Sequence, residues 1–165
     1  MTSRRSGAHS FAYSADARAR VLILGSMPGA ESLRQQQYYA FRHNAFWRIM
    51  GELYDFPLET PYPERLELLK AHRIALWDVL AECERPGSLD SAIRAPRPND
   101  IPGLVGKLPH LEKILCNGGA ARNYLRRFFP ELDAQQLPST SPAAARFSYA
   151  QKLAAWKAAL ESAQR

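Results

Sequence analysis

Short apolar runs that alternate with helical patterns constrain the fold of this chain more than any other feature of its sequence. Such runs, partly β-branched and ended by Gly, Asp or Asn, are typical of strands buried on both faces. They cover residues 20–25, 73–78, 113–116 and, more weakly, 136–138. Amphipathic patterns predict helices over 44–54, 63–71, 120–128 and 148–163. This order predicts an α/β fold, a three-layer α/β/α sandwich around a short, mainly parallel four-stranded central sheet.

The length of 165 residues suits one domain, so we expect residues 1–165 to form a single unit, with 1–10 as a flexible tail. The segment 82–109 is rich in Pro, Arg and Gly. It predicts a long ordered loop that contains one short helix near 101–106. Long loops in compact domains are more often functional than accidental.

Composition excludes several classes of protein. No apolar run is long enough to cross a bilayer, and no hydrophobic stretch follows Arg4 and Arg5 as in a secretory signal. Cys83 and Cys116 are too few for a cysteine-built metal site or a disulfide scaffold. We therefore expect a cytoplasmic protein, associated with the nucleoid, that needs no metal or organic cofactor. The net charge of +6, carried mostly by arginine, favours a polyanionic partner.

In parallel sheets, ligands bind beyond the carboxyl ends of the strands. The segments that follow the predicted strands are Gly-Ser-Met-Pro-Gly at 25–29, Asp78, Asn-Gly-Gly at 117–119 and Ser-Thr-Ser-Pro at 139–142. The first lacks the glycine spacing of a dinucleotide-binding turn and the Lys-Ser/Thr pair of a phosphate-cradling loop. These segments predict a site of another kind at one edge of the sheet.

Five short motifs occur in order along the chain. They are Gly-Ser-Met-Pro-Gly at 25–29, Asn-Ala-Phe-Trp at 44–47, Trp-Asp-Val-Leu at 77–80, Cys-Asn-Gly-Gly-Ala at 116–120 and Leu-Pro-Ser-Thr-Ser-Pro at 137–142. The ordered set resembles the uracil-DNA glycosylase superfamily, most closely its hypoxanthine-DNA glycosylase branch. The resemblance implies a monofunctional enzyme that flips a deaminated base, hypoxanthine first, out of duplex DNA and hydrolyses its bond to the sugar. It implies a monomer without a membrane partner.

The resemblance also implies roles for particular residues. Asn44 would be catalytic and hold the attacking water, although Asn is also a favoured helix N-cap and the two roles are compatible. The base-binding pocket would comprise Gly25, Ser26, Met27, Pro28, Gly29, Tyr39 and Asp78. DNA would be bound by Ser139, Thr140, Ser141, Pro142 and Arg146.

Two pocket residues have simple alternative roles. Tyr39 would stack on the extruded base, or else belong with Tyr38 and Phe41 to the core and its boundary. Asp78 could accept a hydrogen bond from N1–H of hypoxanthine, where adenine has an acceptor, or it could cap the turn after its strand. Five arginines are candidates for contacts with phosphate, namely Arg42, Arg85, Arg94, Arg97 and Arg146.

The chain also departs from the pattern of the uracil-cleaving branches. Met27 replaces the usual Asp or Asn that positions water, and Leu137 replaces a polar residue before Pro-Ser. The wedge that fills the gap left by the base corresponds to Ser141, which is small. The loss of both polar positions supports one alternative, a catalytically inactive DNA-binding module. Met27 argues against efficient removal of uracil, but a glycosylase for uracil or mismatched thymine stays open as the other alternative.

Overall fold

A four-stranded parallel sheet forms the centre of the computed structural model, which describes residues 7–163. Its strands are β2 (Val21–Gly25), β3 (Ile74–Asp78), β6 (Lys113–Asn117) and β7 (Gln135–Leu137), in the order β3-β2-β6-β7. The pairings of β2 with β3, of β2 with β6 and of β6 with β7 are all parallel. All residues of β2 are buried, as expected for an apolar central strand. The predicted sheet is confirmed.

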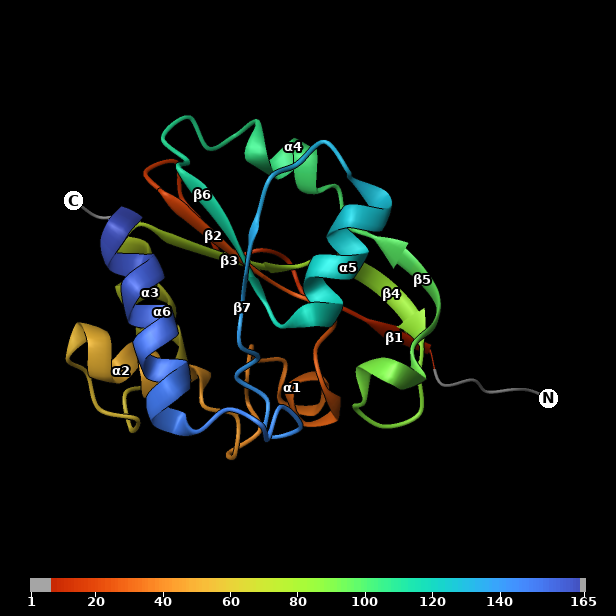
Figure 1. The fold of residues 1–165 in the computed structure, drawn as a ribbon, viewed down its shortest axis with the longest axis horizontal. Helices are drawn as coiled ribbons and strands as arrows, with labels where there is room; N and C mark the ends of the chain where they lie inside the picture. The colour runs from red at the N-terminus through yellow and green to blue at the C-terminus, as the bar shows by residue number, and fades with distance from the viewer. Residues whose placement is uncertain (1–6, 164–165) are drawn as a thin grey trace.

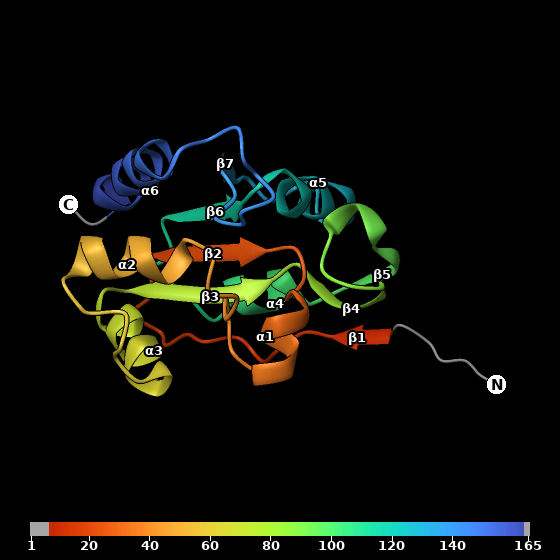
Figure 2. The ribbon, with the colours of Figure 1, turned by 90° about the horizontal axis from the view of Figure 1, so that it is seen from below.

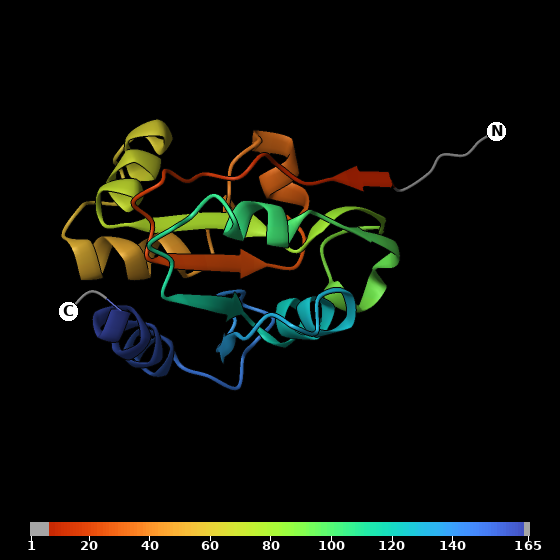
Figure 3. The same ribbon diagram turned by 90° about the horizontal axis from the view of Figure 1, so that it is seen from above.

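Helices cover both faces of this sheet (Figures 1 and 2). The helices are α1 (Ala30–Gln35), α2 (Phe46–Tyr54), α3 (Tyr62–Ala71), α4 (Ile101–Val105), α5 (Gly119–Phe128) and α6 (Tyr149–Ala163). Figure 3 shows α2, α3 and α6 together on the left, and α5 with the strands of a second sheet on the right. This arrangement confirms the three-layer α/β/α fold. Only α1 was not predicted, because its sequence is polar and buries only Ser32.

The second sheet corrects two predictions. It is antiparallel, with β4 (Leu80–Glu84) between β1 (Gly7–His9) and β5 (Arg94–Pro98). The prediction of a flexible tail over 1–10 is thus wrong for Gly7–His9, and residues 1–6 lie outside the described residues. The predicted loop over 82–109 is wrong where β4 and β5 pair, although α4 confirms its short helix.

The composition of the outer strands explains why the sequence did not reveal this sheet. β5 has the sequence Arg-Ala-Pro-Arg-Pro, and proline is tolerated in a strand only where its missing N–H faces outward, as at an edge. β1 is short, and its sequence Gly-Ala-His has little strand propensity. Both strands therefore depend on pairing with β4, which supplies the buried Leu80 and Cys83.

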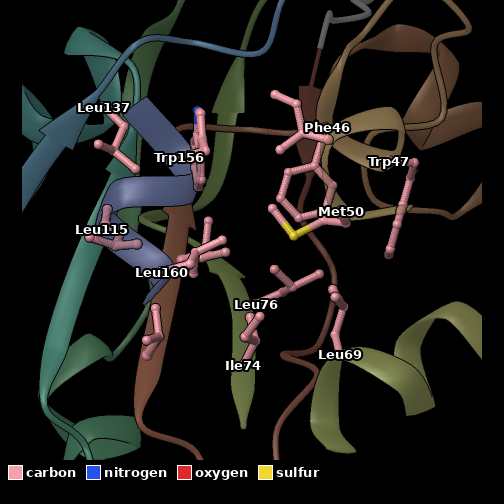
Figure 4. Packing of buried hydrophobic residues seen from close by; sticks show 14 of the residues in the cluster. Phe46, Trp47, Met50, Leu69, Ile74, Leu76, Leu115, Leu137, Trp156 and Leu160 are labelled. Atoms are coloured by element: carbon pink, nitrogen blue, oxygen red, sulfur yellow. The ribbon is translucent and has the colours of Figure 1, made fainter. Parts of the chain in front are cut away.

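The alternation of side chains along β2 divides the core into two clusters. Val21 and Ile23 pack on one face of the sheet with α2, α3 and α6, whereas Leu22 and Leu24 pack on the other. Trp156 of α6 is completely buried on the first face, where its ring meets Phe46 edge to face (Figure 4). Its Nε1 also donates to the carbonyl of Pro138, 3.0 Å away. The core thus holds the segment that follows β7.

We predict that Trp156→Ala lowers the free energy of unfolding by about 3–5 kcal/mol, because it removes a fully buried indole and its hydrogen bond. Urea denaturation followed by circular dichroism measures this change. Lys157→Ala, next along the helix and exposed, is the control and should change stability by less than about 0.5 kcal/mol. Equal losses in the two variants would contradict this account of the core.

Candidate active site at the carboxyl edge of the parallel sheet

The register of the parallel sheet brings three polar positions together. Gly25 at the end of β2 pairs with Asp78 of β3, and Leu24 pairs with Cys116 of β6, so that Asn117 lies beside Gly25. A cavity of about 520 Å³ opens at this edge, within the size range of small-molecule sites. In Figure 1 its walls lie along the lower part of the molecule, where α1, the segment after β7 and the segment between β4 and β5 meet.

Nearly all the predicted site residues line this one cavity. Those present are Gly25, Ser26, Met27, Pro28, Gly29, Tyr39, Asn44, Asp78, Ser139, Thr140, Ser141 and Pro142. Arg146 is not among them. It is exposed, and its guanidinium lies over the ring of Phe147, 4.8 Å from the centroid.

Asp78 is an unpartnered carboxyl group at the wall of the cavity. The residue is 3% exposed, and its Oδ2 has no hydrogen-bond partner among the described residues. Burial, and secondarily the charge of Asp90, raise the pKa of Asp78 to about 7, while the Arg85 guanidinium acts in the opposite direction. Gly25 is required beside it, because a Cβ there would overlap Asp78 Oδ1 and lie 3.2 Å from Tyr39 Oη.

Tyr39 forms an aromatic wall of the cavity. One face of its ring stacks on Phe46, with 4.1 Å between centroids and 24° between planes, and Phe46 is itself buried. The backbone of Tyr39 is left-handed, with a φ of 56°, an uncommon and unfavourable conformation for a bulky residue. Its hydroxyl is buried, and burial, with the charge of Asp78 second, raises its pKa. Tyr38, in contrast, is a core residue whose hydroxyl donates to the carbonyl of Ala12.

Asn44 lines the cavity just before α2. Its Oδ1 accepts a hydrogen bond from the amide of Phe46, 3.0 Å away, as a capping side chain does. This bond orients the amide group and leaves one lone pair of Oδ1 and both Nδ2 hydrogens for other partners. Asn44 is half-buried. Asn44 therefore holds the first amide of α2 from the position before the N-cap, which is Ala45, and lines the cavity as well.

Thr140 connects three segments of the chain: the one that follows β7, the end of β6 and the start of α2. Its amide donates to Asn117 Oδ1 at 2.9 Å, and its hydroxyl accepts from Asn117 Nδ2 at 3.0 Å. Its carbonyl accepts from the amide of Ala45, next to Asn44, at 2.9 Å. With only 1% of its surface exposed, Thr140 contributes to the site by fixing its neighbours.

The segment that follows Thr140 is held in place by its own hydrogen bonds. Ser139 Oγ accepts from the amide of Ser141, and Ser141 Oγ accepts from the amide of Ala143. The ammonium group of Lys152, almost fully buried on α6, donates to the carbonyl of Ser141. This ordered segment, with a cation behind it, is suited to approach a phosphate.

Two other predicted positions take structural roles. The Met27 side chain is buried in the second core cluster with Leu22 and Leu24, and Leu137 is buried in the first. Arg85, a candidate for phosphate contact, is only 4% exposed and donates to the carbonyl of Pro28. Its burial leaves it unable to reach DNA, which corrects that prediction.

Sequence reasoning missed two parts of the site. The first is Asn117, which the sequence shows at the end of a strand in the Asn-Gly-Gly turn but which we did not assign to the cavity. The second is the segment Ser88, Leu89 and Asp90, far along the chain from the other lining residues. Its position depends on the second sheet, which the patterns in the sequence did not predict.

Within residues 7–163 there is no group of three or more His, Cys, Asp or Glu side chains arranged to hold a metal ion. No helix in that part of the chain is long and apolar enough to span a membrane.

We predict that the ionisation of Asp78 lowers the free energy of unfolding of the wild type, relative to that of Asp78→Asn, as the pH rises from about 4 to about 7. A raised pKa means that the folded state binds more protons than the unfolded state in this window, so that stability decreases with pH. Asp78→Asn cannot ionise and should lack this fall. Urea midpoints of both proteins at about pH 5 and about pH 8 test the prediction. Parallel pH dependence in the two proteins would contradict it.

Comparison with known proteins agrees with this geometry. A "Hypoxanthine DNA glycosylase" from Methanosarcina acetivorans is 42% identical over 137 residues, which are 81% of this chain and 85% of the relative. A protein of the same name from Methanosarcina barkeri is 38% identical over 110 residues, 66% of this chain and 70% of the relative.

The fold is similar to that of a solved structure. The solution NMR structure of a protein from M. acetivorans, described as a candidate uracil DNA glycosylase, superposes with a TM-score of 0.82 at 37% identity. The superposition covers 96% of this chain and 99% of the chain in the solved structure. Residues 11–163 match the family model of the uracil DNA glycosylase superfamily, and the chain belongs to this superfamily.

Proposed function

We propose that this chain is a DNA glycosylase that hydrolytically removes hypoxanthine from duplex DNA. The observation that carries the proposal is one cavity that brings together an unpartnered carboxyl group, an aromatic wall and the oriented amide of Asn44. The names of the two Methanosarcina relatives support hypoxanthine as the first substrate.

Asp78 is proposed to read the edge of the base. Hypoxanthine presents an N1–H donor beside the C6 carbonyl, whereas adenine presents an acceptor at N1 beside an amino group. With a pKa of about 7, Asp78 is present in both protonation states near neutral pH. Either state accepts from N1–H, and the neutral state also donates to O6. The ionised carboxylate only accepts, so it cannot pair with N1 of adenine, whereas the neutral acid can donate to that atom; discrimination against adenine therefore depends on the ionised state. Uracil and xanthine share the N–H and carbonyl pattern, so they are expected as weaker substrates.

The aromatic wall supplies binding energy without discrimination between bases. Tyr39 has one ring face on Phe46, and we propose that the other stacks on the extruded base. Stacking of a base on an aromatic side chain is worth about 1–3 kcal/mol. This energy offsets part of the few kcal/mol needed to unstack a nucleotide, and mispaired hypoxanthine needs less.

Asn44 is proposed to act at the sugar. The bond from C1′ to the base nitrogen breaks and its electron pair leaves with the base, water adds its oxygen to C1′, and the proton that the water loses ends on the departing base through the solvent, so that the products are the sugar hydroxyl and neutral hypoxanthine. Asn44 Oδ1 can accept from that water, while Nδ2 can donate to the base or sugar. Such fixed dipoles position the water and stabilise the charge that develops between sugar and base. This role does not require a strong base at position 27.

The remaining contacts are proposed to position the DNA. Ser139, Ser141 and Pro142 would approach the phosphates on one side of the lesion, together with the exposed Arg146. No lysine is among the described residues that line the cavity, so we propose hydrolysis without strand cleavage. The substrate would be duplex DNA, bound by a monomer at the nucleoid.

Labelled duplexes that each carry one lesion test the proposed function. Hypoxanthine, uracil, xanthine or mismatched thymine is incubated with the protein, and abasic sites are then cleaved with hot alkali. We expect scission mainly at hypoxanthine. Scission only at uracil or mismatched thymine would overturn the proposed substrate, and binding without scission at any lesion would overturn the activity.

We predict that Asn44→Ala lowers the single-turnover rate of hypoxanthine excision by about 10²–10³-fold, because it removes the amide that positions the water. Asn44→Ser is the matched variant. Serine can still cap the helix, so that variant should keep its stability, whereas alanine loses about 1 kcal/mol. Both should lose excision. A wild-type rate in either variant would remove Asn44 from the mechanism.

A further inference from the structure

Two exposed apolar side chains stand at the rim of the cavity. The large hydrophobic residues with high exposure among the described residues are Tyr13, Phe41, Leu58 and Leu89. Of these, Phe41 and Leu89 line the cavity, and Leu89 has the highest exposure of the four, at 60%. Leu89 is also absent from both core clusters. Together, Phe41 and Leu89 give the rim of the cavity an exposed apolar surface, which is suited to contact a bound ligand.

The residues on either side of Leu89 fix it in this exposed position. Ser88 Oγ accepts from the amide of Ala30 at 2.7 Å, and Asp90 Oδ1 accepts from Ser26 Oγ at 2.6 Å. Ala30 and Ser26 both belong to the cavity wall. Leu89 therefore lies between two anchors on that wall.

The buried Arg85 connects the same segment to the cavity wall. Its guanidinium donates to the carbonyl of Pro28 in the wall and reaches the carbonyl of Ser88 at 3.5 Å. Leu89 is thus exposed within an ordered segment. The hydrogen bonds of Ser88, Asp90 and Arg85 hold this segment at the cavity and keep Leu89 away from the core.

DNA offers the place where such a side chain can be buried. A nucleotide that leaves the base stack opens a gap, and proteins that distort DNA fill such gaps with apolar side chains. Ser139 and Ser141, which also line the cavity, are small, and each hydroxyl already accepts a hydrogen bond from the backbone. Those serines cannot replace the stacking area of a base.

We propose that Leu89 enters the duplex and occupies the space that the extruded base leaves. It is a positioning residue that keeps the nucleotide in the cavity, and it takes no part in the chemistry. The proposal rests on the proposed glycosylase function. It places the wedge on the segment between β4 and β5 and not at Ser141, in the segment after β7.

Leu89→Ala tests this role, with Leu58→Ala as its control. Leu58 is similarly exposed, at 54%, but does not line the cavity. Because both side chains lie largely in water, neither variant should lose much stability, which thermal melting checks. With hypoxanthine in an ordinary duplex, we expect single-turnover excision by Leu89→Ala to fall about tenfold or more and that by Leu58→Ala to match the wild type.

A second duplex separates a wedge from a general structural role. It carries a bulky pyrene nucleotide opposite hypoxanthine, which itself fills the gap and pushes the lesion out. We expect Leu89→Ala to recover most of its rate on this duplex. A wild-type rate of Leu89→Ala on the ordinary duplex, or an equal loss on both duplexes, would overturn the proposal. Absence of excision by the wild-type protein would instead overturn the proposed function, and this inference with it.

Discussion

The parallel pairing of β2 with β3 on one side and β6 on the other is the constraint on which the rest of this structure depends. The pairing places Gly25, Asp78 and Asn117 next to one another at the carboxyl edge of the sheet. A shift of one residue in either pairing would turn Asp78 or Asn117 toward the opposite face. The fully buried Leu22, Ile23 and Leu24 resist such a shift, because each face of β2 fits its own core cluster.

The hydrogen bonds of Thr140 hold two further segments of the chain against this edge of the sheet. Through Asn117 they connect the segment after β7 with the end of β6, and through Ala45 they connect it with the start of α2. Asn44 is thereby held opposite Asp78 and Tyr39 in the wall of the same cavity. The geometry separates two tasks: a carboxyl group and an aromatic ring are suited to bind a base, and an amide is suited to hold water. Met27, whose position is polar in the uracil-cleaving branches, belongs to the core.

The parallel sheet and most of the site could be predicted from sequence because both depend on local patterns. Strands such as Val21–Gly25 are continuous apolar runs, and the cavity-lining residues follow the ends of these strands. The second sheet could not be predicted in this way. The strand Arg94–Pro98 has two prolines and no buried residue, so its conformation is set by pairing with β4 and not by its own composition. The position of Leu89 at the cavity follows from that pairing. For this reason Leu89 could not be assigned to the cavity from the sequence.

A crystal structure of the protein with a duplex that contains a cleavage-resistant 2′-fluoro analogue of deoxyinosine tests the central claim most directly. The account predicts that the base lies in the cavity on the ring of Tyr39, with N1–H directed at the Asp78 carboxyl group and a water between Asn44 and C1′. A base that remains in the duplex stack, or one that occupies the cavity with Asn44 remote from the sugar, would contradict it.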